Sequence, residues 1–296
     1  MADLKQSKAP DVGYGDLWAS TDRPAIEASE RLKAMCLESA QYLDGNLEAR
    51  ISEDPDAAFW ESYLCKVLLD VGLPVTPRPH RRHQNKGPDL QLGDVDAWCE
   101  AIATRPGTGC DAVPSPPETG VSEVPDKALK VRLANALEEK RRKYESYRAK
   151  GVVRPGEPCV VAINGGLVPS ARLELSIPRI VSAVFPFGMP AVRINTDTGE
   201  IVESFHVHQG EVHKARGAMV STSGFLSTEN AVVSAVVYAS ADIFNHPSRA
   251  GLDFVLVHNP NCTDRLPRGF IKRGLEYWKE GEQLHWSDHD AKRDDA

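Results

Sequence analysis

The sequence predicts an α/β fold, with a mixed sheet in the first half of the chain and further β-rich elements in the second half. Three observations indicate this: a capped helix that begins at Asp54-Pro55, alternating apolar and polar residues over 88–103, and an amphipathic helix over 126–149 that is followed by an apolar strand at 158–163. The expected order in this region is therefore helix, hairpin, helix, strand.

The composition is that of an ordinary water-soluble protein. The chain has 296 residues, of which 41% are hydrophobic and 26% charged, and a formal net charge of −7. It contains no apolar run near the roughly 20 residues that a membrane helix needs, no apolar secretory signal at its start and no C-x-x-C pair. We therefore expect a cytoplasmic protein in a reduced setting, with no membrane partner. The acidic total still permits a local basic face.

Pattern and composition divide the chain into four segments. Residues 1–22 are polar and are expected to form a mobile N-terminal arm. Residues 23–166 hold a helical lead-in and the core, and residues 167–275 form a β-rich second half that packs on this core. Residues 276–296 are expected to be a polar, disordered tail.

The elements before the hairpin are mostly helical. Apolar residues over 23–50 recur at roughly helical spacing, which predicts one or two surface helices. The next helix begins at Asp54, an N-cap acceptor that is followed by proline, and continues to Gly72. A weak strand is expected near 73–78.

The elements after the hairpin begin with a loop. Residues 105–125 are dense in Pro, Gly and Ser, which predicts a long exposed loop. The helix over 126–149 ends before Gly151. In the second half, apolar β-type runs occupy residues 171–177, 191–208, 230–239 and 253–260.

Two carboxylates face each other across the expected hairpin. If the chain turns at Asp94-Val95, a two-residue loop places Asp89 opposite Glu100, with Cβ atoms ~4.5–5.5 Å apart. Two like charges at that distance are destabilising unless a cation lies between them. Mg²⁺ (or Mn²⁺) is typically held by one or two carboxylates plus waters, which leaves positions for a phosphate oxygen and an activated water. The pair therefore predicts a divalent-metal site suited to phosphodiester hydrolysis.

The residues around this pair resemble a known signature. Residues 87–90 (GPDL) and 98–101 (WCEA) are similar to the P-D…(D/E) half of the signature of the PD-(D/E)XK, or restriction-endonuclease-like, nuclease superfamily. The resemblance covers a little over a third of the chain and implies an αβββαβ core with Asp89 and Glu100 as catalytic metal ligands. The signature lysine, two residues after the glutamate, is absent because this sequence has Ile102.

A lysine on the following helix is a candidate substitute. Lys140 lies in the middle of an apolar helical stripe made by Leu129, Leu133, Leu137, Lys140, Tyr144 and Tyr147. Such a lysine must reach past the sheet edge or meet a carboxylate, because an unpaired buried ammonium is costly. In the alternative interpretation its stem covers the apolar face while the ammonium reaches water.

The resemblance also implies roles for residues on both helices. Some members of the superfamily take their lysine, or a related glutamine followed four residues on by tyrosine, from this second helix. By that resemblance Lys140 would orient the attacking water or stabilise phosphate charge, and Tyr144 would support it, with Lys143 as the second choice for the lysine. Other members supply a further acidic ligand from the first helix, which here is Glu61.

Basic residues precede Asp89 closely in the sequence. Arg78, Arg81, Arg82 and Lys86 could contact a nucleic-acid backbone, although a solvated loop is the alternative interpretation. No G-x-x-x-x-G-K-[ST] or G-x-S-x-G motif is present, so ATP hydrolysis and serine hydrolysis are not indicated.

Together these features predict a metal-dependent nuclease of restriction or repair type that acts on nucleic acid, with DNA favoured over RNA. Cleavage of both strands of a duplex would be simplest for a homodimer. The alternative function is a catalytically inactive nuclease-like fold that serves as a nucleic-acid or protein interaction module, and the absence of the in-line lysine supports it. The sequence leaves this choice open.

Overall fold

The computed structural model describes residues 22–43, 47–83, 87–93 and 95–291. Its centre is a mixed sheet of seven strands, which are β1 (Leu90–Leu92), β2 (Ala97–Ala103), β3 (Cys159–Asn164), β8 (Ala235–Ala239), β9 (Val255–His258), β10 (Leu275–Glu280) and β11 (Gln283–Asp288). They lie in the order β1-β2-β3-β8-β9-β10-β11. The pairs β2/β3, β3/β8 and β9/β10 are parallel and the other three are antiparallel. The α/β class expected from the sequence is confirmed.

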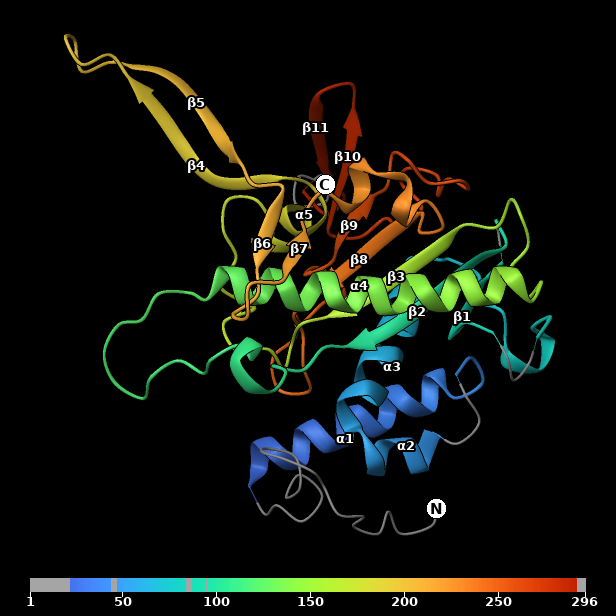
Figure 1. Cartoon of the computed structure of the whole chain (residues 1–296). Helices are drawn as coiled ribbons and strands as arrows, with labels where there is room; N and C mark the ends of the chain where they lie inside the picture. The colour runs from blue at the N-terminus through green and yellow to red at the C-terminus, as the bar shows by residue number, and fades with distance from the viewer. Residues whose placement is uncertain (1–21, 44–46, 84–86, 94, 292–296) are drawn as a thin grey trace.

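Helices cover both faces of this sheet (Figure 1). The helices are α1 (Arg23–Ser39), α2 (Leu47–Glu53), α3 (Pro55–Asp70), α4 (Asp126–Ala149) and α5 (Arg179–Val184), with short 3₁₀ turns η1 (Arg78–His80), η2 (Gly109–Asp111), η3 (Gly224–Leu226) and η4 (Thr228–Asn230). No helix in the described part of the chain is long and apolar enough to cross a membrane.

The two helical layers pack on alternate side chains of the same strands. Val160 and Ala162 of β3 pack with the apolar residues of α1 and α3, while Val161 and Ile163 pack with those of α4. This follows from strand geometry, since successive side chains point to opposite faces. The indole of Trp60 on α3 also donates to the carbonyl oxygen of Ala162 at 3.0 Å. Helix α3 is thereby fixed to the centre of the sheet.

The helices before the hairpin form for the reasons read from the sequence. The side chain of Asp54 accepts a hydrogen bond from the backbone N–H of Ala57 at 3.0 Å, and Pro55 occupies the first helical position. The chain leaves α3 through Gly72, which has a φ of +79° and therefore adopts a conformation that favours glycine. Helices α1 and α2 confirm the expectation of one or two helices over 23–50.

The weak strand expected near 73–78 is reduced to a single bridge. Val75 pairs with Leu92, the N–H of Thr76 donates to Gln91 O at 2.8 Å and the N–H of Gly93 donates to Pro74 O at 2.7 Å. Prolines on both sides limit the pairing because proline has no N–H to donate. The sequence of elements is nevertheless α3, this bridge, β1, β2, α4 and β3.

The second half of the chain differs from expectation at 171–177, where no strand forms. Strand β3 already has β2 and β8 on its two sides, so the sheet offers no free edge there. Two ribbons lie outside the main sheet, and they pair β4 (Phe187–Ile194) with β5 (Ile201–His208) and β6 (Glu211–His213) with β7 (Met219–Ser221). The loop expected over 105–125 is largely irregular and exposed.

The polar tail expected over 276–296 is not a tail over most of its length. Strands β10 and β11 are the last two strands at one end of the sheet, and β10 pairs in parallel with β9. The buried carboxylate of Glu276 is satisfied by the Nε2 atoms of His258 at 2.7 Å and His289 at 2.8 Å. A polar segment can therefore form strands of the main sheet, and composition alone does not predict this. Residues 292–296, and residues 1–21 of the expected N-terminal arm, lie outside the described residues.

Candidate functional site

The hairpin has the register expected from the sequence. Leu90 pairs with Cys99 and Leu92 pairs with Ala97, so Asp89 lies one step before β1 on the side of Glu100. Oδ2 of Asp89 accepts a hydrogen bond from the backbone N–H of Ala101 at 2.7 Å. The first carboxylate is therefore tied to the strand that carries the second one. Asp94, at the expected turn, lies outside the described residues.

Glu100 is almost completely buried, at 1% exposure, on the face of the sheet that α4 covers. Nζ of Lys140 lies 2.8 Å from its Oε2, and the hydroxyl of Tyr147 donates to its Oε1 at 3.0 Å. Nζ of Lys143 lies 3.5 Å from Oε2. Both oxygens of this carboxylate are therefore bound by side chains of α4.

Lys140 reaches Glu100 because of its place on the helical stripe. Leu133, Leu137 and Tyr144 of the same stripe are buried against the sheet, and Lys140 itself is 5% exposed. Burial lowers the pKa of this ammonium, but the carboxylates of Glu100 and Asp89 outweigh it and the pKa is raised. Lys140 is therefore a buried cation paired with a carboxylate, and its ammonium does not extend into water.

Ile102, at the position of the signature lysine, packs partly buried against the apolar residues under α4. Its side chain points to the same face as Glu100, since the two are separated by one residue along β2. Lys140 thus brings to that face the positive charge that β2 does not carry.

The resemblance implied a supporting role for Tyr144 and none for Tyr147, and the two tyrosines have different partners. The hydroxyl of Tyr144 lies 2.7 Å from the carbonyl oxygen of Val160 and 3.0 Å from that of Trp98, so it ties α4 to β2 and β3. Tyr147 is the tyrosine that contacts Glu100. It lies on the same stripe, one turn further on, and the stripe was the signal that could have identified it.

Asp89 is partly buried and lies in a negative electrostatic environment. Burial, the charge of Glu100 and the charge of Glu61 together raise the pKa of Asp89 to about 7. Lys140 and the N–H of Ala101 oppose this shift but do not cancel it. Its second oxygen, Oδ1, accepts no hydrogen bond within the described residues. Of the carboxylates of Asp89, Glu100 and Glu61, that of Asp89 has an oxygen without a hydrogen-bond partner among the described residues.

Glu61, the third expected ligand, is held by α2. Arg50 contacts both of its carboxylate oxygens, with 2.6 Å between Nη1 and Oε2. Glu61 is buried on α3, near enough to Asp89 to influence its pKa. In the described residues no three His, Cys, Asp or Glu side chains are already arranged as ligands of one metal ion.

The basic residues before the hairpin stabilise the loop that contains them. Arg81 is buried and donates to the carbonyl oxygen of Tyr42. Arg82 binds both oxygens of Glu157, each at 2.7 Å, and its guanidinium lies 5.4 Å from the ring centroid of Trp98. Both side chains therefore bind partners within the protein. The sequence had suggested that they would contact a nucleic-acid backbone. Arg78 is partly buried in η1 and also has a partner within the protein, and Lys86 lies outside the described residues.

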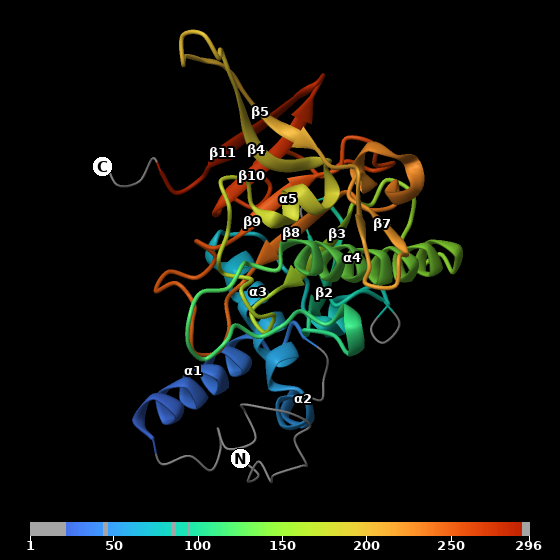
Figure 2. The same ribbon diagram turned by 60° about the vertical axis from the view of Figure 1, so that its left-hand side comes forward.

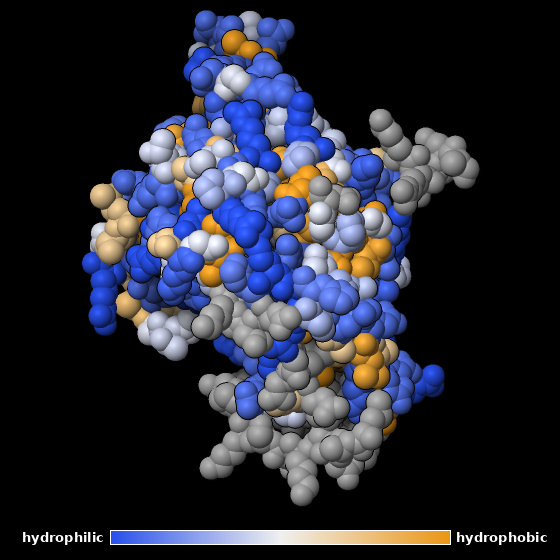
Figure 3. Space-filling view, turned by 90° about the vertical axis from the view of Figure 1, so that its right-hand side faces the viewer, coloured by the Kyte–Doolittle hydropathy of each residue, from blue (hydrophilic) through white to orange (hydrophobic). Residues whose placement is uncertain are grey.

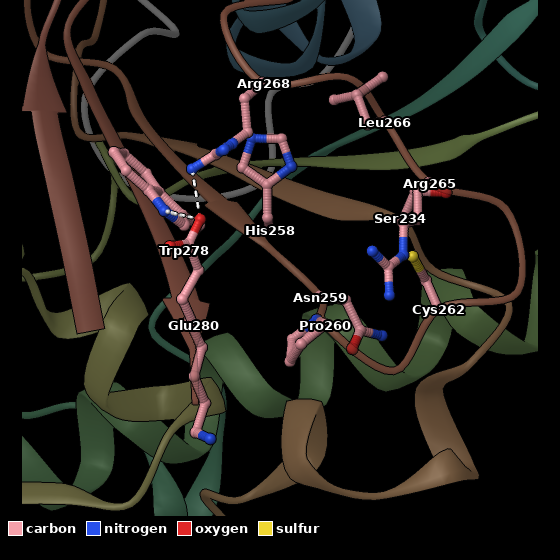
Figure 4. Close-up of a pocket in the computed structure, with 11 residues that line it drawn as sticks. Ser234, His258, Asn259, Pro260, Cys262, Arg265, Leu266, Arg268, Trp278 and Glu280 are labelled. Carbon is pink, nitrogen blue, oxygen red and sulfur yellow. Dashed lines mark hydrogen bonds and ion pairs between the residues drawn. The ribbon is translucent and has the colours of Figure 1, made fainter. Parts of the chain in front are cut away.

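A separate pocket of about 220 Å³ lies between the start of β8 and the ends of β9 and β10 (Figure 4). Arg268 and Trp278 both donate to Oε1 of Glu280, at 2.7 and 3.1 Å, and the guanidinium of Arg268 lies 4.9 Å from the Trp278 ring centroid. His285 stacks on the same indole with its ring centroid at 5.8 Å. The Trp278 ring, Arg268 and Glu280 therefore contact one another, and the pocket residues do not include the candidates named above.

Comparisons of the chain with protein-family models, with curated proteins and with solved structures find no match. The arrangement of Asp89, Glu100 and Lys140 is therefore the basis for a functional assignment.

Proposed function

We propose that the protein is a metal-dependent phosphodiesterase that cleaves nucleic acid, with DNA as the favoured substrate, in a restriction or repair role. The single observation that carries this proposal is the 2.8 Å contact between Nζ of Lys140 and Oε2 of Glu100. A buried lysine on helix α4 and a buried glutamate on strand β2 meet beside Asp89. The signature that the sequence resembles has two acidic residues and a lysine, and here the lysine would come from α4.

The chemistry of the donors suits a hard divalent cation. Asp89 and Glu100 supply carboxylate oxygens, and Mg²⁺ or Mn²⁺ is commonly held by one or two carboxylates plus waters. One oxygen of Asp89 accepts no hydrogen bond from the described residues, and the pKa of this carboxyl group is raised; both features fit a ligand that the metal would deprotonate. A bound cation would supply charge neutralisation at the phosphate and activation of a water. Glu61 would reach such a cation only if it exchanged its contact with Arg50.

The residues of the chain itself would do the positioning. Lys140 holds Glu100 in place and presents a positive charge beside the carboxylates, where it could orient a water or stabilise charge on a phosphate oxygen. Tyr147 fixes the other oxygen of Glu100. Tyr144 secures the helix that carries both residues to the strand that carries Glu100.

The order of the elements adds support. The arrangement α3, Val75 bridge, β1, β2, α4 and β3 follows the αβββαβ order of the restriction-endonuclease-like core, and the corresponding segments are adjacent in the sheet. We propose this core as the finer description of the α/β fold. A fold likeness alone does not establish an activity, which depends on the residues of the site.

The test is a cleavage assay on supercoiled and single-stranded DNA with Mg²⁺ or Mn²⁺. We expect cleavage with either metal, none in EDTA, and none for Asp89→Ala. Asp70→Ala is the matched control, because Asp70 is a half-exposed aspartate at the end of α3 and pairs only with Lys66 among the described side chains. Wild-type activity in Asp89→Ala would refute the site.

One observation favours the alternative of an inactive nuclease-like interaction module. Each oxygen of Glu100 already has a partner on α4, and Glu61 is neutralised by Arg50. If these contacts persist when Mg²⁺ or Mn²⁺ is added, the carboxylates are structural. A melting temperature that does not change with either metal, together with no cleavage, would support the module over the enzyme.

A further inference from the structure

The loop over residues 259–274 forms much of the wall of the pocket between β8, β9 and β10 (Figure 4). It joins the end of β9 to the start of β10, in the part of the sheet that Figure 1 and Figure 2 show away from α1, α2 and α3. Residues 264–274 contain one acidic residue, Asp264, and four basic residues, which are Arg265, Arg268, Lys272 and Arg273. In a chain with a formal net charge of −7, this loop is a local concentration of positive charge.

Contacts with the rest of the fold hold this loop in place. The carboxylate of Asp264 is bound by Arg148 of α4 and accepts a hydrogen bond from the backbone N–H of Gly156 at 2.8 Å. The N–H of Gly269 donates to the carboxylate of Glu276 on β10, also at 2.8 Å. The acidic residue of the loop is therefore neutralised, and a ligand would enter a pocket whose wall is already ordered, which lowers the entropic cost of binding.

Arg265 is a pocket-lining cation that has no hydrogen-bond or ion-pair partner among the described residues. Figure 4 shows its guanidinium turned toward Cys262 and Asn259. Burial raises the pKa of the Cys262 thiol, and the nearby charge of Arg265 opposes that shift. A guanidinium that lines a cavity and binds no protein group is available to an anion.

Arg268 is a second cation of the pocket that a ligand can reach. Its contact with Glu280 joins side chains that are 55% and 56% exposed, and such exposed ion pairs contribute little stability. The ammonium of Lys279 contacts the carbonyl oxygen of Gly281. The pocket thus has three basic side chains and one acidic one, a formal charge of +2 when histidine is not counted.

The size and the remaining lining of the pocket limit the ligand. Its volume of about 220 Å³ lies below the roughly 300–1,000 Å³ of pockets for drug-sized molecules, so a small ligand or the end of a larger one fits. Pro260, Leu266 and the indole of Trp278 supply apolar surface beside the charges. A phosphate monoester carries about −1.5 to −2 charges at pH 7, which matches the charge of the lining better than a single carboxylate does.

The surroundings of the loop are polar. Figure 3 views the molecule from the side on which α4 ends in Figure 1, and Arg148 near that end contacts Asp264 of the loop. This face is mostly hydrophilic, with separate hydrophobic patches. A charged ligand fits this setting better than an extended apolar one.

We propose that the pocket binds a phosphate monoester, with the phosphate on Arg265 and Arg268 and the carbon part of the ligand against the apolar wall. Two sources can supply this group: a free small molecule such as a nucleoside monophosphate, and the 5′-phosphorylated end of a nucleic-acid strand. The inference goes beyond the proposed phosphodiesterase and does not depend on it, since the pocket contains none of the residues of that site.

The first test is calorimetric titration of the 296-residue chain in EDTA with adenosine 5′-monophosphate and, separately, with adenosine. We expect only the monophosphate to bind, and Arg265→Gln to weaken its binding on the order of tenfold through loss of a charge-assisted hydrogen bond. Lys272→Gln is the matched control, because Lys272 is an exposed cation of the same loop that does not line the pocket. Asp89→Ala should bind as the wild type does.

Several outcomes of this titration would overturn the proposal. They are no binding of the monophosphate, equal binding of adenosine, equal weakening in Arg265→Gln and Lys272→Gln, and loss of binding in Asp89→Ala. Circular dichroism checks that each variant is folded, which we expect for Arg265→Gln because this exposed side chain has no partner to lose among the described residues.

A short oligothymidylate, with and without a 5′-phosphate, distinguishes the two sources. If the pocket accepts strand ends, the phosphorylated strand binds more tightly and Arg265→Gln removes the difference. If it accepts only free small molecules, adenosine 5′-monophosphate binds and neither strand shows binding that depends on Arg265. Equal binding of both strands, weakened equally by Arg265→Gln, would show that internal phosphates are bound and would overturn the proposal of a monoester.

Cys262 allows the ligand to be located. It is a partly exposed cysteine that lines the pocket, Cys110 is exposed outside it, and the other four cysteines are buried. Saturating adenosine 5′-monophosphate should slow maleimide labelling of Cys262 and leave labelling of Cys110 unchanged, as measured by mass spectrometry. Unchanged labelling of Cys262, or equal slowing at both cysteines, would overturn the assignment to this pocket.

Discussion

Glu100 and Lys140 form a buried ion pair in which each charge depends on the other. Their side chains are about 2% and 6% exposed, and the two groups are 2.8 Å apart. The stripe on α4 could predict that Lys140 meets a carboxylate, because an unpaired buried ammonium is costly. Spacing alone could not show that Lys143 and Tyr147 would also reach Glu100, since that depends on the rotation of α4 about its axis.

We expect Lys140→Met to lower the free energy of unfolding by about 3–5 kcal/mol, because it leaves the charge of Glu100 buried without its main partner. Lys143→Met should cost less than about 1 kcal/mol, since Lys143 is half exposed. Urea unfolding in EDTA measures both values.

The same variants separate the two lysines in catalysis. Lys140→Met should reduce turnover on the order of 10²–10³-fold at a temperature where it is still folded, as expected for the loss of one electrostatic stabiliser. Lys150→Met, beyond the end of α4, is the control. Equal losses in all three variants would show that no lysine is positioned for the reaction.

We expect the stability of the metal-free protein to depend on the ionisation of Asp89. Its pKa is raised from 3.8 to about 7, so the folded state binds a proton that the unfolded state has lost between these values. The stabilising contribution of protonated Asp89 is therefore complete below pH 4 and is lost as the pH rises through about 7.

Asp89→Asn removes this dependence. In EDTA the variant should gain stability relative to wild type by on the order of 2–4 kcal/mol between pH 4 and pH 8. Thermal or urea unfolding at several pH values measures this difference. A difference that is constant across the range would mean that Asp89 titrates normally.

At the scale of elements, helix α4 was the most predictable and the strands of the second half were the least. The length and the stripe of α4 are local properties, and the hairpin register follows from a two-residue turn. Residues 171–177 could form a strand only beside a free edge of the sheet. The edge of β3 is occupied by β8, which lies more than 50 residues further along the chain.

The two tyrosines of α4 should respond differently to the loss of their hydroxyl groups. Tyr144→Phe should cost about 1 kcal/mol of stability, because its hydroxyl bonds to backbone carbonyl groups, and should leave turnover unchanged. Tyr147→Phe should affect turnover, because it frees one oxygen of Glu100. The reverse pattern, measured by melting and single-turnover cleavage, would support the catalytic role that the resemblance implies for Tyr144.

At the scale of the whole molecule, β10 and β11 should be essential to the fold. A chain that ends at residue 274 loses the strand that pairs with β9 and leaves His258 without Glu276. We expect this shortened chain to be unfolded or to melt far below the full chain, as judged by circular dichroism. A chain ending at residue 291 should melt like the full one. If the two shortened chains and the full chain melt at the same temperature, residues 276–291 behave as a polar tail and are not needed for the fold.

The most direct measurement is a calorimetric titration of Mn²⁺ into the 296-residue chain at pH 8, without nucleic acid. If Asp89 and Glu100 share a metal site, the wild type should bind one ion, and Asp89→Asn and Glu100→Gln should each weaken binding at least tenfold, or about 1.4 kcal/mol. Asp70→Asn should bind as the wild type does. Absence of binding in the wild type, or equal binding in all four proteins, would contradict the proposed metal-dependent phosphodiesterase.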